Sequence, residues 1–319
     1  MNALTTLPFI DAAQVCRSLP YPALIDALRD AFHEPAMAPR RHVHALHESA
    51  SLLLMPAWQP GREIGVKLVT VMPDNRSHSL PTVHALYVLM DAANGAPLAL
   101  MDGESLTLRR TAAVSALASR YLSREDSRTL LLVGSGRLAP EMAVAHCTAR
   151  AIDRVMVWGR DAARVAAAIA RIREAVPAHV VLEAECELTE ACAQADIVCC
   201  ATTSTEPLVR AMAVRPGTHV DLVGGFRPNM READDALIMS ASLFVDTCEG
   251  ALAEAGDLRQ PLAAGLIGED AVRADLSALV RDEHPGRRES DEITLFKSVG
   301  MAVADLGAAR LVWRTTVQG

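Results

Sequence analysis

A short glycine-rich segment carries the clearest chemical signal in the sequence. Its pattern is G-x-G-x-x-A, and its residues are Gly134, Ser135, Gly136, Arg137, Leu138 and Ala139. The apolar run Thr129–Val133 precedes the segment, and a helical pattern follows it. Glycines in such a strand–turn–helix let backbone N–H groups approach a pyrophosphate at a helix N-terminus. The segment therefore predicts a dinucleotide-binding site, with a tight turn that binds nothing as the alternative.

The end of the next predicted strand, Arg154–Trp158, bears on which dinucleotide binds. Sites that prefer NAD usually carry an acidic residue there, which holds the ribose hydroxyl groups. Here Arg160 comes first, and Arg137 lies in the glycine-rich segment. Because guanidinium groups pair well with phosphate, we predict that NADP(H) is preferred and that NAD(H) can also bind. Asp161 is either the acidic ribose ligand or only the cap of the following helix.

One lysine stands inside an apolar strand pattern. Lys67 lies in the run Gly65–Thr70, where a charge is unexpected unless it faces a cavity. Partial burial and neighbouring positive charges would lower the pKa of this ammonium group and make it a better proton donor near neutral pH. A charge at the edge of a sheet is the ordinary alternative, and the local pattern does not decide between the two.

Length and composition bound the fold and the partners. At roughly 150 residues per domain, the 319 residues predict two domains. The net charge of −8 argues against nucleic acid as a partner, because phosphate binding needs clustered Lys and Arg. No apolar run approaches the roughly 18 residues of a membrane span. Seven cysteines without a C-x-x-C pair, and an N-terminus unlike a secretory signal, predict reduced thiols in a cytoplasmic protein without a metal site.

Aliphatic and helical patterns outline an α+β N-terminal part. Residues 21–33 have helical spacing, and residues 105–121 predict an alanine-rich helix capped by Ser105 or Thr107. Between them, turn signals such as Asn94-Gly95 separate short apolar runs, which predicts a small antiparallel or mixed sheet. The runs are Ser51–Met55, Ile64–Val71, Thr82–Met90 and Pro97–Met101.

From about residue 125, short apolar strands alternate with helices such as 140–149 and 161–176. This alternation predicts βαβ units and a parallel sheet. The last segment, Phe296–Trp313, is helical by pattern. The prediction is therefore an α/β protein, in which a Rossmann doubly wound parallel-sheet domain follows an α+β domain. The predicted strands are Thr129–Val133, Arg154–Trp158, His179–Leu182, Asp196–Ala201, His219–Val223 and Leu243–Asp246.

Several segments spread over residues 41–313 match one known family together. Besides the glycine-rich segment, they are Val66–Thr70, Met101–Gly103, Arg110–Ala116, Val223–Gly225, Arg231–Asp235 and Phe296–Ala302. In this combination the chain resembles the ornithine cyclodeaminase/mu-crystallin family. The resemblance implies a discontinuous substrate-binding and dimerisation domain, residues 1–123 with 298–319, and a Rossmann dinucleotide-binding domain, residues 124–297. It also implies a homodimer that binds a small cyclic imino acid, with no nucleic-acid or membrane partner.

The resemblance implies the substrate site as well. Arg41, Lys67 and Arg110 match the residues that hold the substrate carboxylate, and Lys67 becomes the candidate catalytic proton donor. Thr82 matches a small hydroxyl residue near the substrate. The chemistry supports this grouping, because the planar fork of arginine fits a carboxylate with two parallel hydrogen bonds. Without the resemblance, Arg41 and Arg110 are as readily explained as surface ions.

Further cofactor contacts are expected near the ends of the predicted strands, where Rossmann folds bind their ligands. Thr202 and Thr203 follow one buried strand, and Val223 ends another. Lys297 and Gly300 lie at the predicted start of the helix that returns to the first domain. There, small residues either let the backbone approach the nicotinamide or merely pack.

One position departs from the cyclodeaminases of the family. These enzymes carry an aspartate directly after the pair that matches Gly224–Gly225, and its carboxylate assists the loss of ammonia. The residue here is Phe226, which cannot accept a proton. The resemblance thus implies NAD(P)H-dependent reduction of cyclic ketimine carboxylates, from Δ1-pyrroline-2-carboxylate to L-proline and from Δ1-piperideine-2-carboxylate to L-pipecolate. The alternatives are an ornithine cyclodeaminase, which Phe226 disfavours, an amino-acid dehydrogenase such as alanine dehydrogenase, and a non-catalytic, crystallin-like NADP-dependent binding protein.

Overall fold

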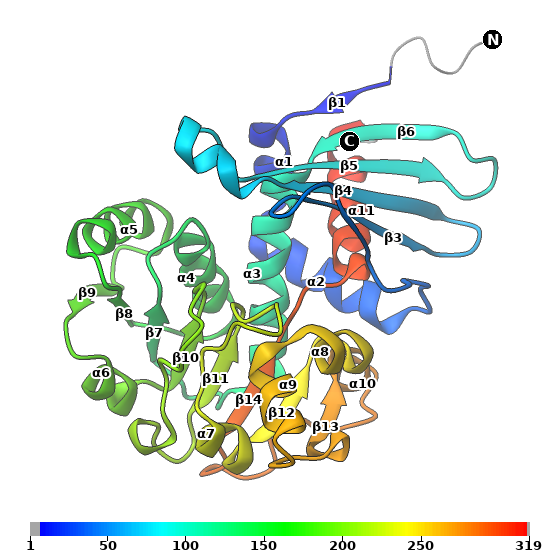
Figure 1. Cartoon of the computed structure of the whole chain (residues 1–319). Helices are drawn as coiled ribbons and strands as arrows, with labels where there is room; N and C mark the ends of the chain where they lie inside the picture. Colours follow the sequence, from blue (N-terminus) through cyan, green and yellow to red (C-terminus); the bar gives the residue numbers. More distant parts are fainter. Residues whose placement is uncertain (1–6, 318–319) are drawn as a thin grey trace. The chain divides into compact units, whose positions relative to one another are not determined.

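The computed structural model describes residues 7–317 and divides the chain into two compact units (Figure 1). Unit 1 contains the described residues up to Thr111 together with those from Met301 onward, and unit 2 contains Ala112–Gly300. Helix α3 (Gly103–Leu122) begins in unit 1 and ends in unit 2. The first unit is therefore built from two stretches of chain that lie far apart in the sequence.

Unit 1 is built on a six-stranded sheet with the order β1-β6-β5-β4-β3-β2. Neighbouring strands are antiparallel, except that β1 runs parallel to β6. Gly95, in the predicted Asn-Gly turn, has a φ of 74° and joins β5 to β6. The predicted small sheet is thus confirmed. The strands are β1 (Phe9–Ile10), β2 (His42–Ala45), β3 (Ser51–Trp58), β4 (Glu63–Val71), β5 (Val83–Asp91) and β6 (Pro97–Asp102).

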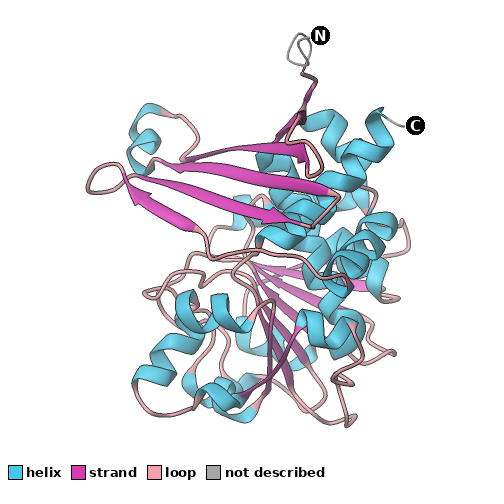
Figure 2. Ribbon diagram, turned by 90° about the vertical axis from the view of Figure 1, so that its right-hand side faces the viewer, coloured by secondary structure: helices cyan, strands magenta, loops and turns pink. Residues whose placement is uncertain are grey.

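Helices cover one face of this sheet (Figure 2). The helix α11 (Ala302–Val317) packs on β3 and β4 and against α2 (Tyr21–His33), while α1 (Ala12–Ser18) packs on β6. Alternate side chains of the strands point toward these helices and are buried, among them Met55, Lys67 and Tyr87. A short 3₁₀ helix, η1 (Pro73–His78), connects β4 to β5.

Unit 2 is a doubly wound α/β unit with an eight-stranded sheet, ordered β13-β12-β14-β11-β10-β7-β8-β9. Every pairing in it is parallel, and helices lie on both faces (Figure 2). The predicted Rossmann fold is confirmed. Its strands are β7 (Thr129–Val133), β8 (Arg154–Trp158), β9 (Val181–Glu185), β10 (Ile197–Cys200), β11 (His219–Leu222), β12 (Ser242–Val245), β13 (Val272–Asp275) and β14 (Thr294–Lys297). Its helices after α3 are α4 (Leu138–Ala149), α5 (Ala162–Ala175), α6 (Leu188–Gln194), α7 (Asp235–Ser240), α8 (Cys248–Glu254), α9 (Gly256–Ala263) and α10 (Leu276–Val280), with 3₁₀ turns η2 (Ala211–Ala213) and η3 (Glu269–Ala271).

Two local predictions are wrong. The segment Phe296–Trp313 is not one helix, because residues 294–297 form β14 in the middle of the sheet and α11 begins only at Ala302. All four residues of β14 are buried, so the strand shows no apolar–polar alternation, and periodicity cannot distinguish it from a buried helix. Neither Ser105 nor Thr107 caps α3: the Ser105 N–H donates to the Asp102 carboxylate at 2.8 Å, which makes Asp102 the cap.

Two further predictions concern the state of the cysteines and the presence of membrane-spanning helices. All seven cysteines lie in the described part of the chain, and all are free thiols. Among residues 7–317, no helix combines the length and hydropathy that crossing a bilayer requires.

Candidate functional site

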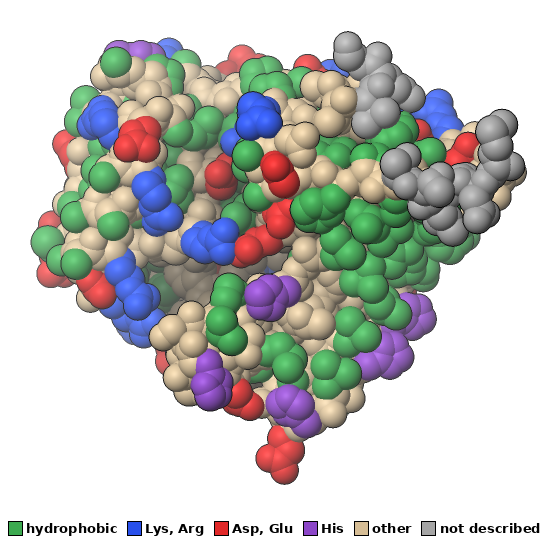
Figure 3. Space-filling view, turned by 90° about the horizontal axis from the view of Figure 1, so that it is seen from above, with side chains coloured by type: hydrophobic (Ala, Val, Ile, Leu, Met, Phe, Trp, Pro, Cys, Tyr) green, Lys and Arg blue, Asp and Glu red, His purple; other side chains and the backbone are tan. Residues whose placement is uncertain are grey.

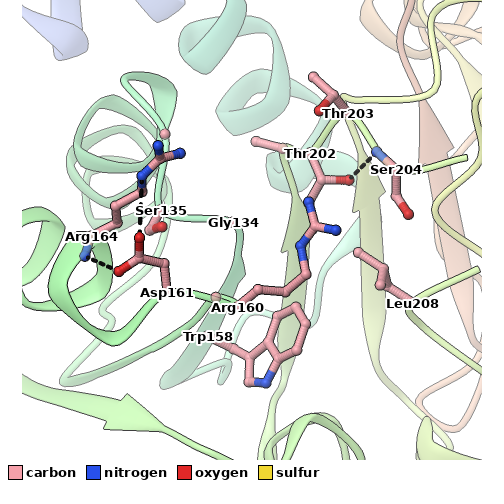
Figure 4. A pocket seen from close by; sticks show the side chains of 13 residues that line it. Gly134, Ser135, Trp158, Arg160, Asp161, Arg164, Thr202, Thr203, Ser204 and Leu208 are labelled. Carbon is pink, nitrogen blue, oxygen red and sulfur yellow. Dashed lines mark hydrogen bonds and ion pairs between the residues drawn. The ribbon is translucent and has the colours of Figure 1, made fainter.

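Unit 2 contains a cavity of about 390 Å³ at the carboxyl ends of β7, β8 and β10 (Figure 4). This edge of a parallel sheet is where open α/β folds bind ligands. The cavity brings together several of the residues predicted to bind a cofactor, namely Gly134, Ser135, Gly136, Arg160, Thr202 and Thr203. Arg137 follows these glycines as the N-cap of α4, Leu138 begins the helix, and Ala139 is buried.

The first glycine of the loop leaves room that a larger residue would fill. Gly134 has a φ of 118°, and a Cβ atom at this position would lie 2.7 Å from the carbonyl oxygen of Ala201. Only glycine tolerates this conformation without strain. The backbones of Gly134 and Ala201 therefore lie close together just before α4, as expected for a loop that binds a pyrophosphate.

Basic side chains line the cavity where β8 ends. Arg160 and Arg164 both line it, together with Asp161 (Figure 4). The Asp161 carboxylate accepts hydrogen bonds from the N–H groups of Ala163 and Arg164 at 3.0 and 3.2 Å. Asp161 therefore caps α5, which was one of the two roles predicted for it. Arg164 was not predicted, although it lies one helical turn after Arg160.

Two residues predicted to contact the cofactor are engaged inside unit 2. Lys297 does not begin the returning helix but ends β14, and its side chain is fully buried. Its ammonium group lies 3.2 Å from the Asp257 carboxylate and donates to the carbonyl oxygens of Leu222 and Gly224. The Lys297 side chain therefore packs within unit 2 and does not line the cavity. Gly300 follows β14, and its N–H donates to Asp246 at 2.7 Å.

A buried acid lies behind the cavity. The carboxylate of Glu232 accepts hydrogen bonds from the N–H and the hydroxyl of Thr202 at 2.7 and 2.8 Å. Burial raises the pKa of Glu232 to about 7. The positive charge of Lys297 acts to lower this pKa, and the negative charge of Asp257 raises it further. Val223, directly after β11, donates its N–H to the Cys200 carbonyl oxygen and does not line this cavity.

The polar cluster of unit 1 centres on Asp305. The Lys67 ammonium lies 2.9 and 2.8 Å from the two Asp305 oxygens, and the Nε of Arg110 donates to Asp305 at 2.8 Å. All three side chains are buried, and Lys67 is only 2% exposed. Burial lowers the pKa of Lys67 to about 7; Asp305 opposes this change, and Arg110 and Arg41 reinforce it. The predicted grouping of Lys67 with Arg110 is present in the structure.

The other two predicted substrate residues differ in their distance from this cluster. His42 pairs with Leu54 and Met55 pairs with Lys67, so Arg41 stands at the same level of the sheet as Lys67, with strand β3 between them. Thr82 instead precedes β5 by one residue, whereas Lys67 pairs with Tyr87. Five residues of strand correspond to about 17 Å. Within unit 1, Thr82 is therefore not next to Lys67.

Sequence reasoning missed Asp305 and Tyr87. Asp305 is the single carboxylate of the otherwise apolar and basic α11, and this isolation in a buried helix was a usable signal. Tyr87 pairs with Lys67 across the sheet and is fully buried beside Gly65, where a Cβ atom would collide with its hydroxyl. Burial raises the pKa of Tyr87 well above its ordinary value, and the Asp305 charge adds to this effect.

The chain has two lysines, and both are buried beside an aspartate. Lys67 pairs with Asp305 in unit 1, and Lys297 pairs with Asp257 in unit 2. All other positive side chains are arginines and histidines. A buried ammonium group is costly unless a carboxylate compensates it, so both positions are closely constrained.

A third buried polar group lies in the core of unit 2. Asp221, on β11, lies 3.4 Å from the Nε2 of His146 and accepts a hydrogen bond from the Cys199 thiol at 3.3 Å. Burial raises the pKa of Asp221, but the hydrogen bond and charge of His146 outweigh this effect and hold it below the ordinary value. Asp221 is 0% exposed in the core, so it cannot replace the aspartate that is absent at Phe226.

The Rossmann fold, the glycine cradle and the basic strand end define a dinucleotide-binding protein. A sequence profile of the ornithine cyclodeaminase/mu-crystallin family matches residues 11–319, so the chain belongs to this family. A Δ1-pyrroline-2-carboxylate reductase of Colwellia psychrerythraea is 39% identical over 312 residues, which cover 96% of this chain and 98% of that protein.

Two solved structures are similar over nearly the whole chain. One is the Δ1-pyrroline-2-carboxylate reductase of Thermococcus litoralis in complex with NADH and L-proline; it has a TM-score of 0.91 and 31% identity, and 97% of each chain is covered. The other is an archaeal alanine dehydrogenase dimer with bound NAD; it has a TM-score of 0.90 and 26% identity, and 98% of this chain and 96% of that chain are covered.

Proposed function

We propose that the chain is an NAD(P)H-dependent reductase of cyclic ketimine carboxylates, which converts Δ1-pyrroline-2-carboxylate to L-proline. The cluster of Lys67, Arg110 and Asp305 carries the proposal, because it holds two buried basic groups and only one carboxylate. Buried charges are normally paired, so a substrate carboxylate would supply the missing negative charge. The names of the Colwellia and Thermococcus reductases, and the L-proline in the latter structure, support this substrate class.

The residues of unit 1 have distinct tasks in this proposal. Arg41 and Arg110 bind the carboxylate, for which the guanidinium fork is suited. A bound carboxylate would raise the pKa of Lys67 above about 7, so that its amino group is protonated at neutral pH. Lys67 then delivers this proton to the ring nitrogen, directly or through a water molecule. When bound, the nicotinamide supplies a hydride to the imine carbon, and proton and hydride together convert C=N to CH–NH.

The residue after the Gly224–Gly225 pair supports reduction over cyclodeamination. Phe226 is 40% exposed, and the guanidinium of Arg227 lies 5.6 Å from the centre of its ring. An aromatic ring with a cation beside it has no group that could accept a proton from the attacking amine and return it to the departing ammonia. Ornithine is therefore expected to be a poor substrate.

A panel of substrates tests the proposed function. Oxidation of NADPH and NADH should be followed with Δ1-pyrroline-2-carboxylate, with Δ1-piperideine-2-carboxylate and with pyruvate plus ammonia or methylamine. Release of ammonia from ornithine should be measured in parallel. Rapid turnover of a cyclic imine supports the proposal. Faster turnover of pyruvate with an amine would assign an amino-acid dehydrogenase, and tight cofactor binding without any turnover would assign a binding protein.

We further propose that NADP(H) is the preferred cofactor. Arg160 and Arg164 line the cavity at the end of β8, and Asp161 there is used to cap α5. The bound NADH and NAD of the two similar structures support a nicotinamide cofactor without deciding between the two forms.

Replacing Arg160 by serine should weaken NADPH binding by at least about tenfold and leave NADH binding within about twofold, because a charge-assisted contact to the 2′-phosphate is lost. Binding is measured by quenching of protein fluorescence. Arg171→Ser, on the exposed side of α5, is the matched control. Equal losses for both cofactors would assign Arg160 to a part of the dinucleotide that they share.

The open face of the sheet in unit 1 supports a homodimer. The strand residues that point away from the helices are apolar but only half buried, and hydrophobic side chains gather over this part of the molecule (Figure 3). Large exposed apolar patches mark interfaces, and the similar alanine dehydrogenase is described as a dimer. We propose that a second copy of the chain covers this face. Its central residues are Leu54, Trp58, Val66, Leu68, Val88 and Leu100.

Replacing Val66 by aspartate should convert a dimer into a monomer, because a carboxylate would be buried without a partner in the middle of the interface. Light scattering measures the mass, which should fall from twice the chain mass of 34.1 kDa to that mass itself. Val181→Asp, on the exposed edge strand β9, should leave the mass unchanged. A wild-type monomer would refute the proposed interface.

A further inference from the structure

Three fully buried charged residues lie directly behind the cavity of unit 2. Glu232, Asp257 and Lys297 are all 0% exposed, in a unit whose core cluster is built mainly from aliphatic side chains. Taking such groups out of water is expensive, and a well-packed apolar set often gives equal or greater stability. Their presence at this position therefore calls for a role beyond stability.

Glu232 connects this buried group to the wall of the cavity. One carboxylate oxygen accepts both the N–H and the hydroxyl of Thr202, at 2.7 and 2.8 Å. Thr202 follows β10 and lines the cavity with its neighbours Ala201 and Thr203. The Thr202 hydroxyl in turn accepts the N–H of Ser204 at 3.3 Å, which continues the cavity wall (Figure 4). The shape of this wall thus depends on where the Glu232 carboxylate stands.

Glu232 is itself held firmly in place. Its N–H donates to Asp257 at 2.7 Å, and Asp257 lies 3.2 Å from the Lys297 ammonium. Lys297 also donates to the carbonyl oxygen of Gly224 at 2.8 Å. A Cβ atom on Gly224 would lie 2.3 Å from both the Glu232 carboxylate and the Thr202 carbonyl oxygen. Contacts with α9 therefore anchor the backbone of Glu232, and the residues after β11 leave little space beside its carboxylate.

We propose that Glu232 is a positioning residue for the dinucleotide, which acts by holding Thr202 and the segment after β10 in the conformation that binds the cofactor. The proposal rests on the proposed function only in taking a nicotinamide dinucleotide as the ligand. This role requires an acceptor oxygen within hydrogen-bond distance of Thr202, and it does not require a negative charge. Since burial brings the pKa of Glu232 to about 7, the neutral carboxyl is already accessible near neutral pH, and its carbonyl oxygen still accepts.

Two conservative substitutions separate reach from charge. Glu232→Gln keeps the acceptor oxygen in place and removes the charge, whereas Glu232→Asp keeps the charge and withdraws the carboxylate by roughly 1.5 Å, one carbon–carbon bond. We expect Glu232→Asp to raise the Kd for NADPH at least about tenfold, because its shorter side chain loses both hydrogen bonds from Thr202. Glu232→Gln retains an acceptor for these bonds, so its Kd should stay within about threefold of wild type. A residue needed only for charge balance with Lys297 would give the opposite order.

Binding is measured by protein fluorescence on the whole chain, and thermal unfolding establishes that each variant is folded. Glu206→Asp and Glu206→Gln, on the exposed part of the same segment, are the matched controls. With saturating NADPH, kcat of the aspartate variant should recover while KM for the cofactor stays high. Near-normal binding by folded Glu232→Asp, or equal losses in both Glu232 variants, overturns the proposal. If Glu232→Asp does not fold, Thr202→Val decides from the cavity side: weaker NADPH binding supports the proposal, and unchanged binding overturns it.

The same measurements keep the two proposals apart. If wild type binds NADPH but reduces no cyclic imine, the proposed function fails, and the Glu232 variants still report on cofactor binding. If wild type reduces the imine and the two Glu232 variants bind NADPH equally well, only the positioning role fails.

Discussion

Replacing Lys67 by methionine is expected to lower kcat/KM for Δ1-pyrroline-2-carboxylate by about 10³-fold, within the range that general acid catalysis contributes. Methionine fills a similar volume but carries no proton, and Asp305 retains Arg110 as its partner. The fold should therefore survive. Oxidation of NADPH measures the loss, and NADPH binding to unit 2 should remain unchanged. A variant that keeps full turnover would remove Lys67 from the mechanism.

The pH profile gives an independent check on Lys67. Burial lowers its pKa to about 7, so the protonated fraction falls as the pH rises through 7, and kcat/KM should fall with it. Lys67→Arg keeps the charge permanently and cannot donate a proton at these pH values. Its residual activity should be low and should lack this decrease. If the decrease persists in Lys67→Arg, it belongs to the titration of the substrate.

Replacing Asp305 by asparagine should lower the free energy of unfolding by about 3–5 kcal/mol, the usual cost of removing one partner from a buried ion pair. Lys67 and Arg110 would be left without the carboxylate that each now contacts at 2.8 Å. Urea unfolding at neutral pH measures the change. Asp30→Asn is the control, because its ion pair with Arg29 is exposed, and such pairs contribute about 0–1 kcal/mol.

The sign of the pH dependence follows from the pKa of Asp305. Burial raises this pKa, but the charges and hydrogen bonds of Arg110 and Lys67 outweigh that effect and hold it below the ordinary 3.8. A carboxylate with a lowered pKa stabilises the fold above its unfolded-state value and loses this contribution as the pH falls below it. Wild type should therefore lose stability below about pH 4, and Asp305→Asn should lose less. Parallel pH curves for both proteins would contradict the assignment.

The elements that the sequence predicts well are those with a strong local pattern. The glycine-rich segment lies between β7 and α4 as expected, and the antiparallel strands of unit 1 follow their apolar runs. Strand β14 escaped prediction because a strand buried on both faces has no periodicity of its own. Its neighbours β11 and β12 lie far from it in the sequence, so only the folded sheet reveals where it belongs.

The candidate site shows the same limit. Lys67 stands out because a lone charge in an apolar strand is rare, and its chemistry could be argued from that position. Asp305 pairs with it across 238 residues of sequence, a separation that no local pattern spans. Lys297 was assigned to the cofactor from its segment alone, while its actual partners, Asp257 and Gly224, come from other elements of unit 2.

The pairing of both lysines with buried aspartates has a consequence for chemical labelling. Acylating reagents react with exposed, uncharged amines, and this chain presents no lysine side chain to solvent. Both lysines therefore stay protected from such reagents while their units stay closed. Since Lys67 belongs to unit 1 and Lys297 to unit 2, each unit carries one built-in reporter of its own opening. The order in which the two lysines become acylated reveals which unit opens first.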